Sequence, residues 1–437
     1  MWRKIGFFLL MIVAAVVPVV VLVLLPSWGI LAGVALLIAW LALTRAGRQA
    51  WSATAVAVAT VPQRLGSSSV VVIGIAGVVG VLVALFAMAE GFRATVQQTG
   101  SDDTAIVLRA GSQTEINSVV DHDSIVVVSQ EPQVKRDAQS RPIASPEIVV
   151  AASIPKKSTG LDANVEIRGV GAEVWELHPQ LRIVAGRRFR PGLRELIVGK
   201  GALREFAHTS MGSTLELNQQ PWTVVGEFDS GDSHNSELWA DTAVVATTYS
   251  RGNSVSSATV LLQNPRAFDA FKAAITSDPR LKLEVKTTRD YFTAQSEGLT
   301  KIIRVLGTTV AVIMGIGALF GALNTMYAAV STRTREIATL RAIGFRGAPV
   351  VVSVLIETLL LALGGGVIGA AIAWALFDNY TASTLGANFS QVVFEFRVTP
   401  GLVASGLKWA LAIGFLGGLF PAVRAARMSV TDGLREL

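Results

Sequence analysis

The sequence predicts a polytopic α-helical membrane protein with six spans, one large extracytoplasmic α+β domain and a helical stalk. Of its 437 residues, 51% are apolar and only 16% are charged, whereas soluble domains usually carry about 25% charged residues. Several apolar runs approach or exceed the length of about 20 residues that a membrane-spanning helix needs. Arginines recur beside the ends of these runs, which is typical of the cytoplasmic side of a membrane.

The first 45 residues predict a transmembrane hairpin. Two apolar runs, Leu9–Leu25 and Gly29–Leu43, lie on either side of a turn expected at Pro26 and Ser27. A signal peptide is the alternative, but its apolar region is usually about 7–15 residues long and no second run follows it. A hairpin would place both outer ends in the cytoplasm, where the basic residues Arg3, Lys4, Arg45 and Arg48 belong.

The rest of the chain divides into segments of alternating character. Residues 46–68 predict either an interfacial amphipathic helix or a plain connector. The segments that follow are core span 69–90, hydrophilic domain 91–297, stalk and core span 298–330, cytoplasmic helix 331–347, core span 348–377, outer loop 378–401, core span 402–424 and cytoplasmic tail 425–437.

Domain 91–297 has the pattern of an α+β domain on the outer side of the membrane. Short runs rich in Val, Ile and Thr predict strands, and two of these runs are Ser124–Ser129 and Thr242–Thr247. Helices are expected at Gly201–His208 and at Pro265–Thr276, where Asn264 and Pro265 form a start signal. Three preceding spans place the domain outside if the chain starts inside.

A long helix should follow the domain. Thr288 can cap a helix that meets no breaker until about Ser331, and roughly 40 residues would extend about 60 Å, twice the hydrocarbon thickness. Its outer part should therefore stand above the membrane as a stalk. Small residues permit close approach of membrane helices, so helix packing is assigned to Gly315, Gly317, Gly321, Gly365 and Gly369.

The segment between the stalk helix and the next span is short, basic and amphipathic. Its arginines place it in the cytoplasm, and a structured helix there predicts a docking surface for a cytoplasmic protein. The expected docking residues are Arg333, Arg335, Glu336, Ile337, Leu340, Arg341, Phe345 and Arg346. Glu357 lies inside the following span, where a carboxylate is either functional or paired with an arginine such as Arg341 or Arg346.

The segment from Arg335 to Gly369 resembles the membrane core of the macrolide-exporter and FtsX-like (type VII, mechanotransmission) ABC permeases. Its sequence is REIATLRAIGFRGAPVVVSVLIETLLLALGGGVIG. The closing segment PAVRAARMSVTDGLREL, from Pro421 to Leu437, is similar to the end of that family. Looser likeness lies in GRRFR (Gly186–Arg190), ELIVGKG (Glu195–Gly201) and WTVVG (Trp222–Gly226). The N-terminal hairpin departs from the four-span core of the family.

This resemblance implies a non-catalytic permease subunit in the bacterial inner membrane. The segment from Arg335 to Gly344 would be the coupling helix for a separate ABC ATPase, which would bind ATP and Mg²⁺, while this chain binds no cofactor. A second permease copy, membrane lipids and a periplasmic adaptor or hydrolase are the other expected partners. Export or extraction of an amphiphilic lipid, lipoprotein, peptide or drug is expected; the alternative is an FtsX-like signalling subunit that regulates a cell-wall hydrolase.

The sequence argues against several other functions. It lacks the phosphate-binding motif GxxxxGK[ST] and the motifs GxSxG and HExxH. It has no cysteine, which excludes thiolate metal sites. The net charge of +6 is explained by cytoplasmic arginines rather than nucleic-acid binding. The acidic segments Asp121–Asp123 and Asp229–Asp241 read as surface loops rather than metal sites, and no catalytic or metal-binding residue is nominated.

Overall fold

The computed structural model describes residues 25–431, which divide into two compact units. The helical unit comprises residues 25–88, 303–378 and 397–431 of the described range. The α/β domain comprises residues 89–302 and 379–396. Two helices, α4 (Leu65–Gln98) and α10 (Thr288–Thr332), each contribute residues to both units.

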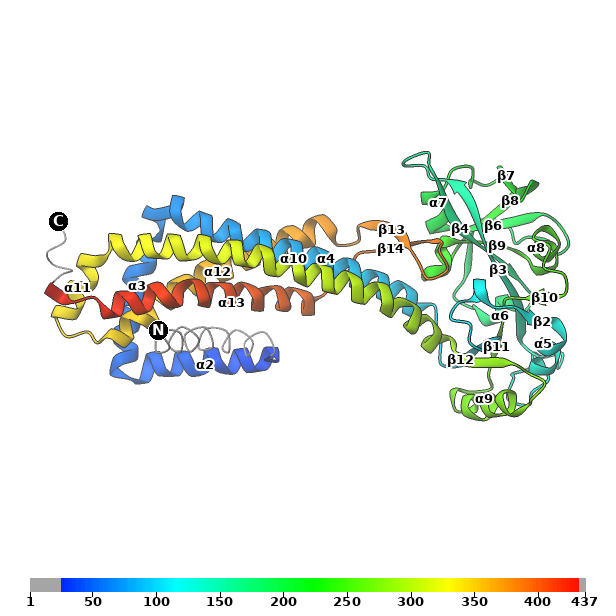
Figure 1. The fold of residues 1–437 in the computed structure, drawn as a ribbon, viewed down its shortest axis with the longest axis horizontal. Coiled ribbons are helices and arrows are strands. Elements are labelled where there is room, and N and C mark those ends of the chain that lie inside the picture. The colour runs from blue at the N-terminus through cyan, green and yellow to red at the C-terminus, as the bar shows by residue number, and fades with distance from the viewer. Residues whose placement is uncertain (1–24, 432–437) are drawn as a thin grey trace, which may run out of the picture. The chain divides into compact units, whose positions relative to one another are not determined.

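Within the described residues, four helices are long and apolar enough to cross a membrane. They are α4, α10, α12 (Gly347–Phe377) and α13 (Pro400–Arg427), and Figure 1 labels each of them. α13 begins as its sequence suggests, because Thr399 caps the backbone NH of Leu402 and Pro400 occupies the first helical position. α10 begins at Thr288 and runs unbroken for 45 residues, as predicted.

Small residues allow these helices to pack closely. Gly369 and Gly365 of α12 lie against the backbone of α4: a Cβ atom at Gly369 would lie 2.3 Å from the carbonyl oxygen of Ala76, and one at Gly365 would lie 2.6 Å from that of Val72. On α10, Gly315 lies opposite Ile413 of α13, whereas a Cβ atom at Gly317 or Gly321 would have no atom of another helix within 4 Å.

Replacing Gly369 by alanine is therefore expected to lower the melting temperature of the full-length protein in detergent. The added methyl group would overlap the α4 backbone, and overpacking of this kind typically costs about 1–3 kcal/mol. Gly364→Ala is the matched control on the same helix, because no atom lies within 4 Å of a Cβ atom there. Equal melting temperatures for the two variants would contradict the packing of α12 against α4.

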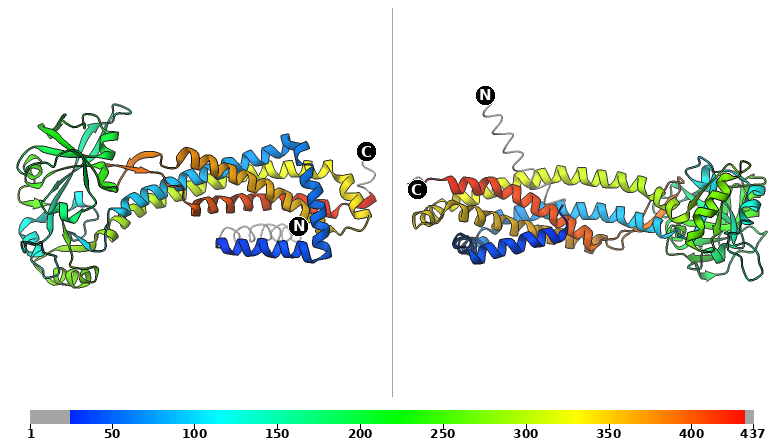
Figure 2. Two further views of the ribbon diagram at one scale, coloured as in Figure 1. Left: turned by 180° about the vertical axis from the view of Figure 1, so that it is seen from behind. Right: turned by 90° about the horizontal axis from the view of Figure 1, so that it is seen from below.

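The described part of the predicted N-terminal hairpin is its second helix. The second apolar run is α2 (Ser27–Leu43), which passes at Thr44 into α3 (Arg45–Ala59) with a bend of 100°. The Thr44 hydroxyl accepts a hydrogen bond from the NH of Gly47 and donates one to the carbonyl of Trp40. Figure 2 shows the bend in the blue part of the ribbon. The two helices together could form a fifth span, whereas residues 9–24, the first half of the predicted hairpin, lie outside the described range.

The segment predicted as connector 46–68 contains most of α3, the short helix η1 (Val61–Arg64) and the start of α4. One face of α3 is buried and consists of small residues: Gly47, Ala50, Ala53, Thr54 and Ala57. This helix packs against α12. α3 is thus held by helix packing within the chain and is not a loose linker.

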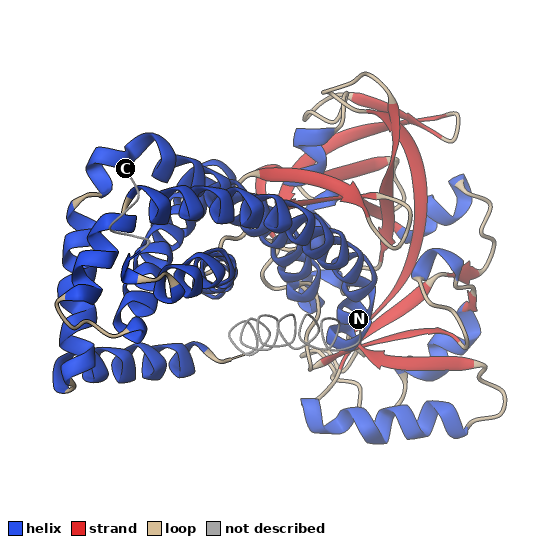
Figure 3. Cartoon of the chain, turned by 60° about the vertical axis from the view of Figure 1, so that its left-hand side comes forward, coloured by secondary structure: helices blue, strands red, loops and turns tan. Residues whose placement is uncertain are grey.

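The α/β domain is built on one mixed sheet of ten strands among the described residues (Figure 3). The order is β12-β1-β11-β3-β4-β9-β6-β8-β5, with β7 pairing to β8, and only the pairs β4–β9 and β6–β8 are parallel. The strands are β1 (Thr104–Arg109), β3 (Ala144–Pro155), β4 (Asp162–Val170), β5 (Arg182–Gly186), β6 (Glu195–Gly199), β7 (Thr214–Leu217), β8 (Gln220–Asp229), β9 (Glu237–Asp241), β11 (Ser257–Leu261) and β12 (Leu283–Thr287).

The main core of the domain is apolar and includes Val107, Ile148, Phe206, Trp222 and Phe271. The remaining elements of the domain surround the sheet and are short. They are η2 (Glu115–Asn117), β2 (Val120–Asp121), α5 (His122–Ser129), α6 (Val174–Leu177), α7 (Lys200–Glu205), η3 (Ser233–Ser236), α8 (Thr242–Thr248), β10 (Ser254–Val255), η4 (Pro265–Ala267) and α9 (Phe268–Ser277).

Two of the predicted strands are wrong. Ser124–Ser129 belongs to helix α5, and Thr242–Thr247 belongs to helix α8. In α8 the side chain of Asp241 accepts a hydrogen bond from the NH of Val244, 3.1 Å away. This N-cap outweighs the preference of Thr and Val for strands, because propensity is weak compared with capping and tertiary contacts.

The predicted outer loop 378–401 contains a β-hairpin that completes the α/β domain. Its strands are β13 (Thr381–Leu385) and β14 (Gln391–Glu395). The NH of Val393 donates to the hydroxyl of Ser236 on η3 (2.8 Å), and Asn164 on β4 donates to the carbonyl of Phe389 at the hairpin turn (3.1 Å). The hairpin is therefore a structural part of a domain whose other residues lie far earlier in the chain.

Candidate functional site

The predicted docking segment forms a short helix, α11 (Thr334–Ala342), between α10 and α12. Its charged residues Arg335 and Glu336 are exposed, and so is Arg346 after it. The side chain of Ile343 is 69% exposed. These residues form an uncovered surface of mixed charge with one large apolar side chain, which suits contact with another protein.

Other predicted docking residues hold α11 in place. Ile337 is buried in an apolar cluster with Met326 of α10, Val350 of α12 and Ala422 of α13. Arg341 donates a hydrogen bond to the carbonyl of Met428, directly after α13. Leu340 and Phe345 are half-buried. The segment thus presents one surface outward and fixes the opposite one against three helices.

Glu357 connects α11 to the rest of the helical unit. It is 3% exposed and pairs with Arg333 (3.3 Å), the residue between α10 and α11, and with Arg64 of η1 (3.2 Å). Arg333 also pairs with Glu336, 3.0 Å away. Glu357 is therefore paired with arginines, which was one of the two expected alternatives, but its partners are Arg333 and Arg64 rather than Arg341 or Arg346.

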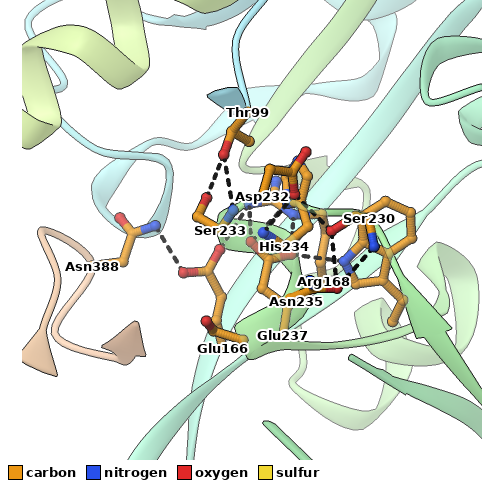
Figure 4. Close-up of polar contacts among 12 residues, drawn as sticks. Thr99, Glu166, Arg168, Ser230, Asp232, Ser233, His234, Asn235, Glu237 and Asn388 are labelled. Carbon is orange, nitrogen blue, oxygen red and sulfur yellow. Dashed lines mark hydrogen bonds and ion pairs between the residues drawn. The ribbon is translucent and has the colours of Figure 1, made fainter. Parts of the chain in front are cut away.

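A second polar site lies inside the α/β domain, around the buried guanidinium of Arg168 (Figure 4). Arg168 donates hydrogen bonds of 2.7–3.2 Å to the carboxylates of Glu115, Glu147, Glu166 and Glu237. All five side chains are at most 9% exposed. The sheet brings most of them together. Glu166 and Arg168 are two residues apart on β4, so they lie on the same face of the sheet, between Glu147 on β3 and Glu237 on β9.

His234 extends this cluster on the side of Glu237. Its Nδ1 lies 2.9 Å from Oε1 of Glu237, and its backbone NH donates to Asp232. The indole NH of Trp239 donates to the other oxygen of Glu237 at 2.7 Å. The ring of His178 lies edge-on to that of His234, with 5.0 Å between centroids.

The prediction that Asp229–Asp241 is a surface loop is wrong. Asp232 is 4% exposed, His234 3% and Glu237 5%, because their opposite charges and hydrogen bonds compensate for burial. Asp121–Asp123 is exposed, as expected for a surface segment. Among the residues that the structure describes, no group of three or more His, Asp or Glu side chains is arranged to hold a metal ion.

Burial and mutual charge shift the pKa values in this cluster in different directions. Burial raises the pKa of Glu166 to about 7, assisted by the nearby charge of Glu237. Burial lowers the pKa of His178 to about 3. Burial also opposes the charged form of His234, but Glu237 and Asp232 outweigh this and raise its pKa to about 9. At neutral pH, His234 is therefore a buried cation and His178 a neutral ring.

The β13–β14 hairpin contributes to the same cluster. Asn388 donates to Glu166 at 3.0 Å and Ser390 donates to the same oxygen at 3.2 Å. This buried network was not predicted from the sequence. The one local signal is the alternation in Asn164–Val170, where Glu166 and Arg168 fall on the same face of a strand, and a solvated face would give the same pattern.

Two family models match this chain. Residues 68–278 match a MacB-like periplasmic core domain, and residues 308–430 match an FtsX-like permease C-terminal domain. The chain belongs to the FtsX-like, MacB-type family of ABC permeases. The resemblance found in the sequence is thereby confirmed, and the four apolar helices and the α/β domain fit this family.

Relatives of the MacB type match about two thirds of this chain. The macrolide export ATP-binding/permease protein MacB of Hahella chejuensis is 25% identical over 66% of this chain and 45% of its own length. MacB of Photorhabdus laumondii is 27% identical over 66% of this chain and 46% of its own. The chain thus spans about half the length of the curated relatives it matches.

A solved structure of the MacB type is also similar. The periplasmic region of MacB from Actinobacillus actinomycetemcomitans is 12% identical and aligns with 46% of this chain and 95% of its own, with a TM-score of 0.35. In this FtsX-like, MacB-type chain, α11 and Glu357 fall within the segment that matches the FtsX-like model, residues 308–430. Most of the α/β domain falls within the segment that matches the periplasmic model.

Proposed function

We propose that this chain is the membrane subunit of an ABC transporter in the bacterial inner membrane. A separate ATPase subunit would bind ATP and Mg²⁺ and dock on α11. ATP binding and hydrolysis there would drive a conformational change of the α/β domain on the outer side, for export or extraction of an amphiphilic substrate. A second permease copy would complete the complex.

The observation that carries this proposal is the construction of α11. Its exposed surface contains Arg335, Glu336, Ile343 and Arg346, while the pair of Glu357 with Arg333 fixes the residue directly before it. A surface that is both exposed and firmly held can transmit a displacement from a bound partner. Its positive residues support a position on the cytoplasmic side.

The second supporting feature is the continuity of α10. Its 45 residues correspond to about 68 Å of helix, more than twice the thickness of the hydrocarbon core. This helix begins in the α/β domain and ends one residue before α11. The relatives are named as macrolide exporters, which favours transport over the regulation of a cell-wall hydrolase.

The absence of cysteine permits a direct test of sidedness. We expect a membrane-impermeant maleimide to label Arg266→Cys, in the α/β domain, from outside intact spheroplasts. Arg346→Cys should be labelled only after permeabilisation, and a co-expressed Walker A-containing ATPase subunit should protect it. Labelling of Arg346→Cys in intact spheroplasts would refute the proposal.

Substitutions of exposed arginines test docking of the ATPase subunit without disturbing the fold. The double variant Arg335→Glu with Arg346→Glu reverses two exposed charges and is expected to release the ATPase subunit from the purified complex. Arg266→Glu is the control, because this side chain is also exposed but belongs to the α/β domain. ATPase retention by the double variant would show that α11 is not the docking site.

A further inference from the structure

The α/β domain contains a polar cavity that the transport proposal does not use. Its volume is about 630 Å³, within the range of small-molecule sites. Its wall includes residues 98–101 at the end of α4 and in the turn after it, Thr288 and Phe292 at the start of α10, and His178 after α6. Glu115, Glu147, Arg168 and His234 also line it.

The buried groups around this cavity carry an excess of negative charge. Arg168 and His234 are the cations that contact the four carboxylates of Glu115, Glu147, Glu166 and Glu237. Of the charged residues in the cavity wall, four are acidic (Asp103, Glu115, Glu147 and Glu176) and three are basic (Lys135, Arg168 and His234), so the wall has one more acid than base. Buried charge without a counter-charge is costly, so the cavity favours a positive ligand over an anion.

Glu147 shows where such a ligand would bind. Its side chain is 3% exposed, and Oε2 accepts from Arg168 at 2.7 Å. Oε1 is buried and has no hydrogen-bond partner, although the residue lines the cavity. A buried acceptor without a partner costs free energy, and a donor held in the cavity would remove this cost.

Protonation alone does not resolve this arrangement. Burial raises the pKa of Glu147, with Arg168, Glu115 and His234 as the charged groups that act on it. A proton on Oε1 would reduce the charge, but the resulting hydroxyl would be a donor that lacks an acceptor. A metal ion is also disfavoured, since the described residues form no ligand cluster for one.

We propose that this cavity binds a small organic cation with an ammonium or amidinium group, which donates to Oε1 of Glu147. A charged N–H donor supplies both the missing positive charge and the missing hydrogen bond. The polar lining distinguishes this ligand from an amphiphilic cargo. The inference does not depend on the coupling mechanism proposed above.

The position of the cavity gives its ligand a means of acting on the protein. The hydroxyl of Thr288, at the first residue of α10, accepts from the NH of Ser101, three residues after the end of α4, at 2.8 Å. Thr288 and Ser101 both line the cavity. A bound cation therefore lies beside the place where the start of α10 is joined to the end of α4.

The test is calorimetric titration of the purified full-length protein with putrescine and with benzamidine. The neutral 1,4-butanediol and the anion succinate serve as comparisons. We expect saturable binding of at least one cation, none of the diol or succinate, and at least about tenfold weaker binding to Glu147→Gln. The amide keeps the shape of the side chain and can still accept from Arg168.

Further variants keep the result interpretable. Glu176→Lys adds a positive charge at an exposed position of the cavity wall and should also weaken cation binding without disturbing the core. Glu216→Gln, exposed on β7 and outside the cavity, should bind as the unmodified protein does. The proposal is overturned if neither cation binds between pH 5 and 9, if the diol binds equally well, or if binding is unchanged in both Glu147→Gln and Glu176→Lys.

Discussion

Replacing Arg168 by methionine is expected to unfold the α/β domain or leave it only marginally stable. The substitution keeps most of the side-chain volume but leaves four buried glutamates with His234 as their remaining cation. Removing one partner of a buried ion pair typically costs about 3–5 kcal/mol, a large part of the 5–15 kcal/mol that stabilises a typical domain. Thermal unfolding and limited proteolysis of the full-length protein in detergent would measure this effect.

Arg187→Met is the matched control for this variant. Arg187 also forms a two-bond pair with a glutamate, Glu195, at 2.6 and 2.7 Å, but its side chain is 44% exposed. Exposed pairs contribute little to stability, so its melting temperature should stay close to that of the unmodified protein. If Arg168→Met and Arg187→Met had the same melting temperature, the charges around Arg168 would have to be solvated or neutral. This result would contradict the buried network.

Glu357→Gln is expected to separate ATP turnover from transport. The amide preserves the shape of the side chain but removes the charge that holds Arg333 and Arg64. Hydrogen bonds to charged groups contribute about 1.5–3 kcal/mol, so the population of correctly held α11 should fall about tenfold or more. Under the proposed function, ATP hydrolysis by the assembled complex would continue while substrate movement falls by a similar factor.

A double-mutant cycle distinguishes a positioning role from general damage. Arg333→Gln alone leaves Glu357 with one cation, whereas the double variant removes the charges on both sides. Because the two residues are in contact, their effects on transport should not add. Glu395→Gln is the control, because Glu395 forms an exposed pair with Arg204. Strictly additive effects on transport would show that Glu357 does not position α11. The same would follow if Glu357→Gln lost no more transport than this control.

The sequence was sufficient for features that depend on local pattern. The length of α10 follows from an uninterrupted run after Thr288, and α11 follows from a basic amphipathic segment between two apolar runs. α8 could not be predicted from its composition, because the N-cap hydrogen bond that Asp241 accepts from the NH of Val244 outweighs the strand preference of Thr242–Thr247. The secondary-structure preference of a segment can be read from its sequence, whereas the contact that overrides this preference often cannot.

The network around Arg168 depends on contacts between distant parts of the chain. Arg168 meets Glu147, Glu115 and Glu237 at separations of 21, 53 and 69 residues. Without the sheet order, the sequence predicts that each of these glutamates is an ordinary exposed residue. Their partners become evident only when β3, β4 and β9 are placed side by side.

The hydrogen bond from Asn388 to Glu166 joins residues 222 positions apart. During synthesis, the ribosome must complete α10, α11 and α12 before the β13–β14 hairpin emerges. The α/β domain therefore cannot complete its interior until these helices have been translated. Assembly of the two units is linked in time, and a recombinant fragment that stops at residue 302 would lack Asn388 and Ser390 of its own interior.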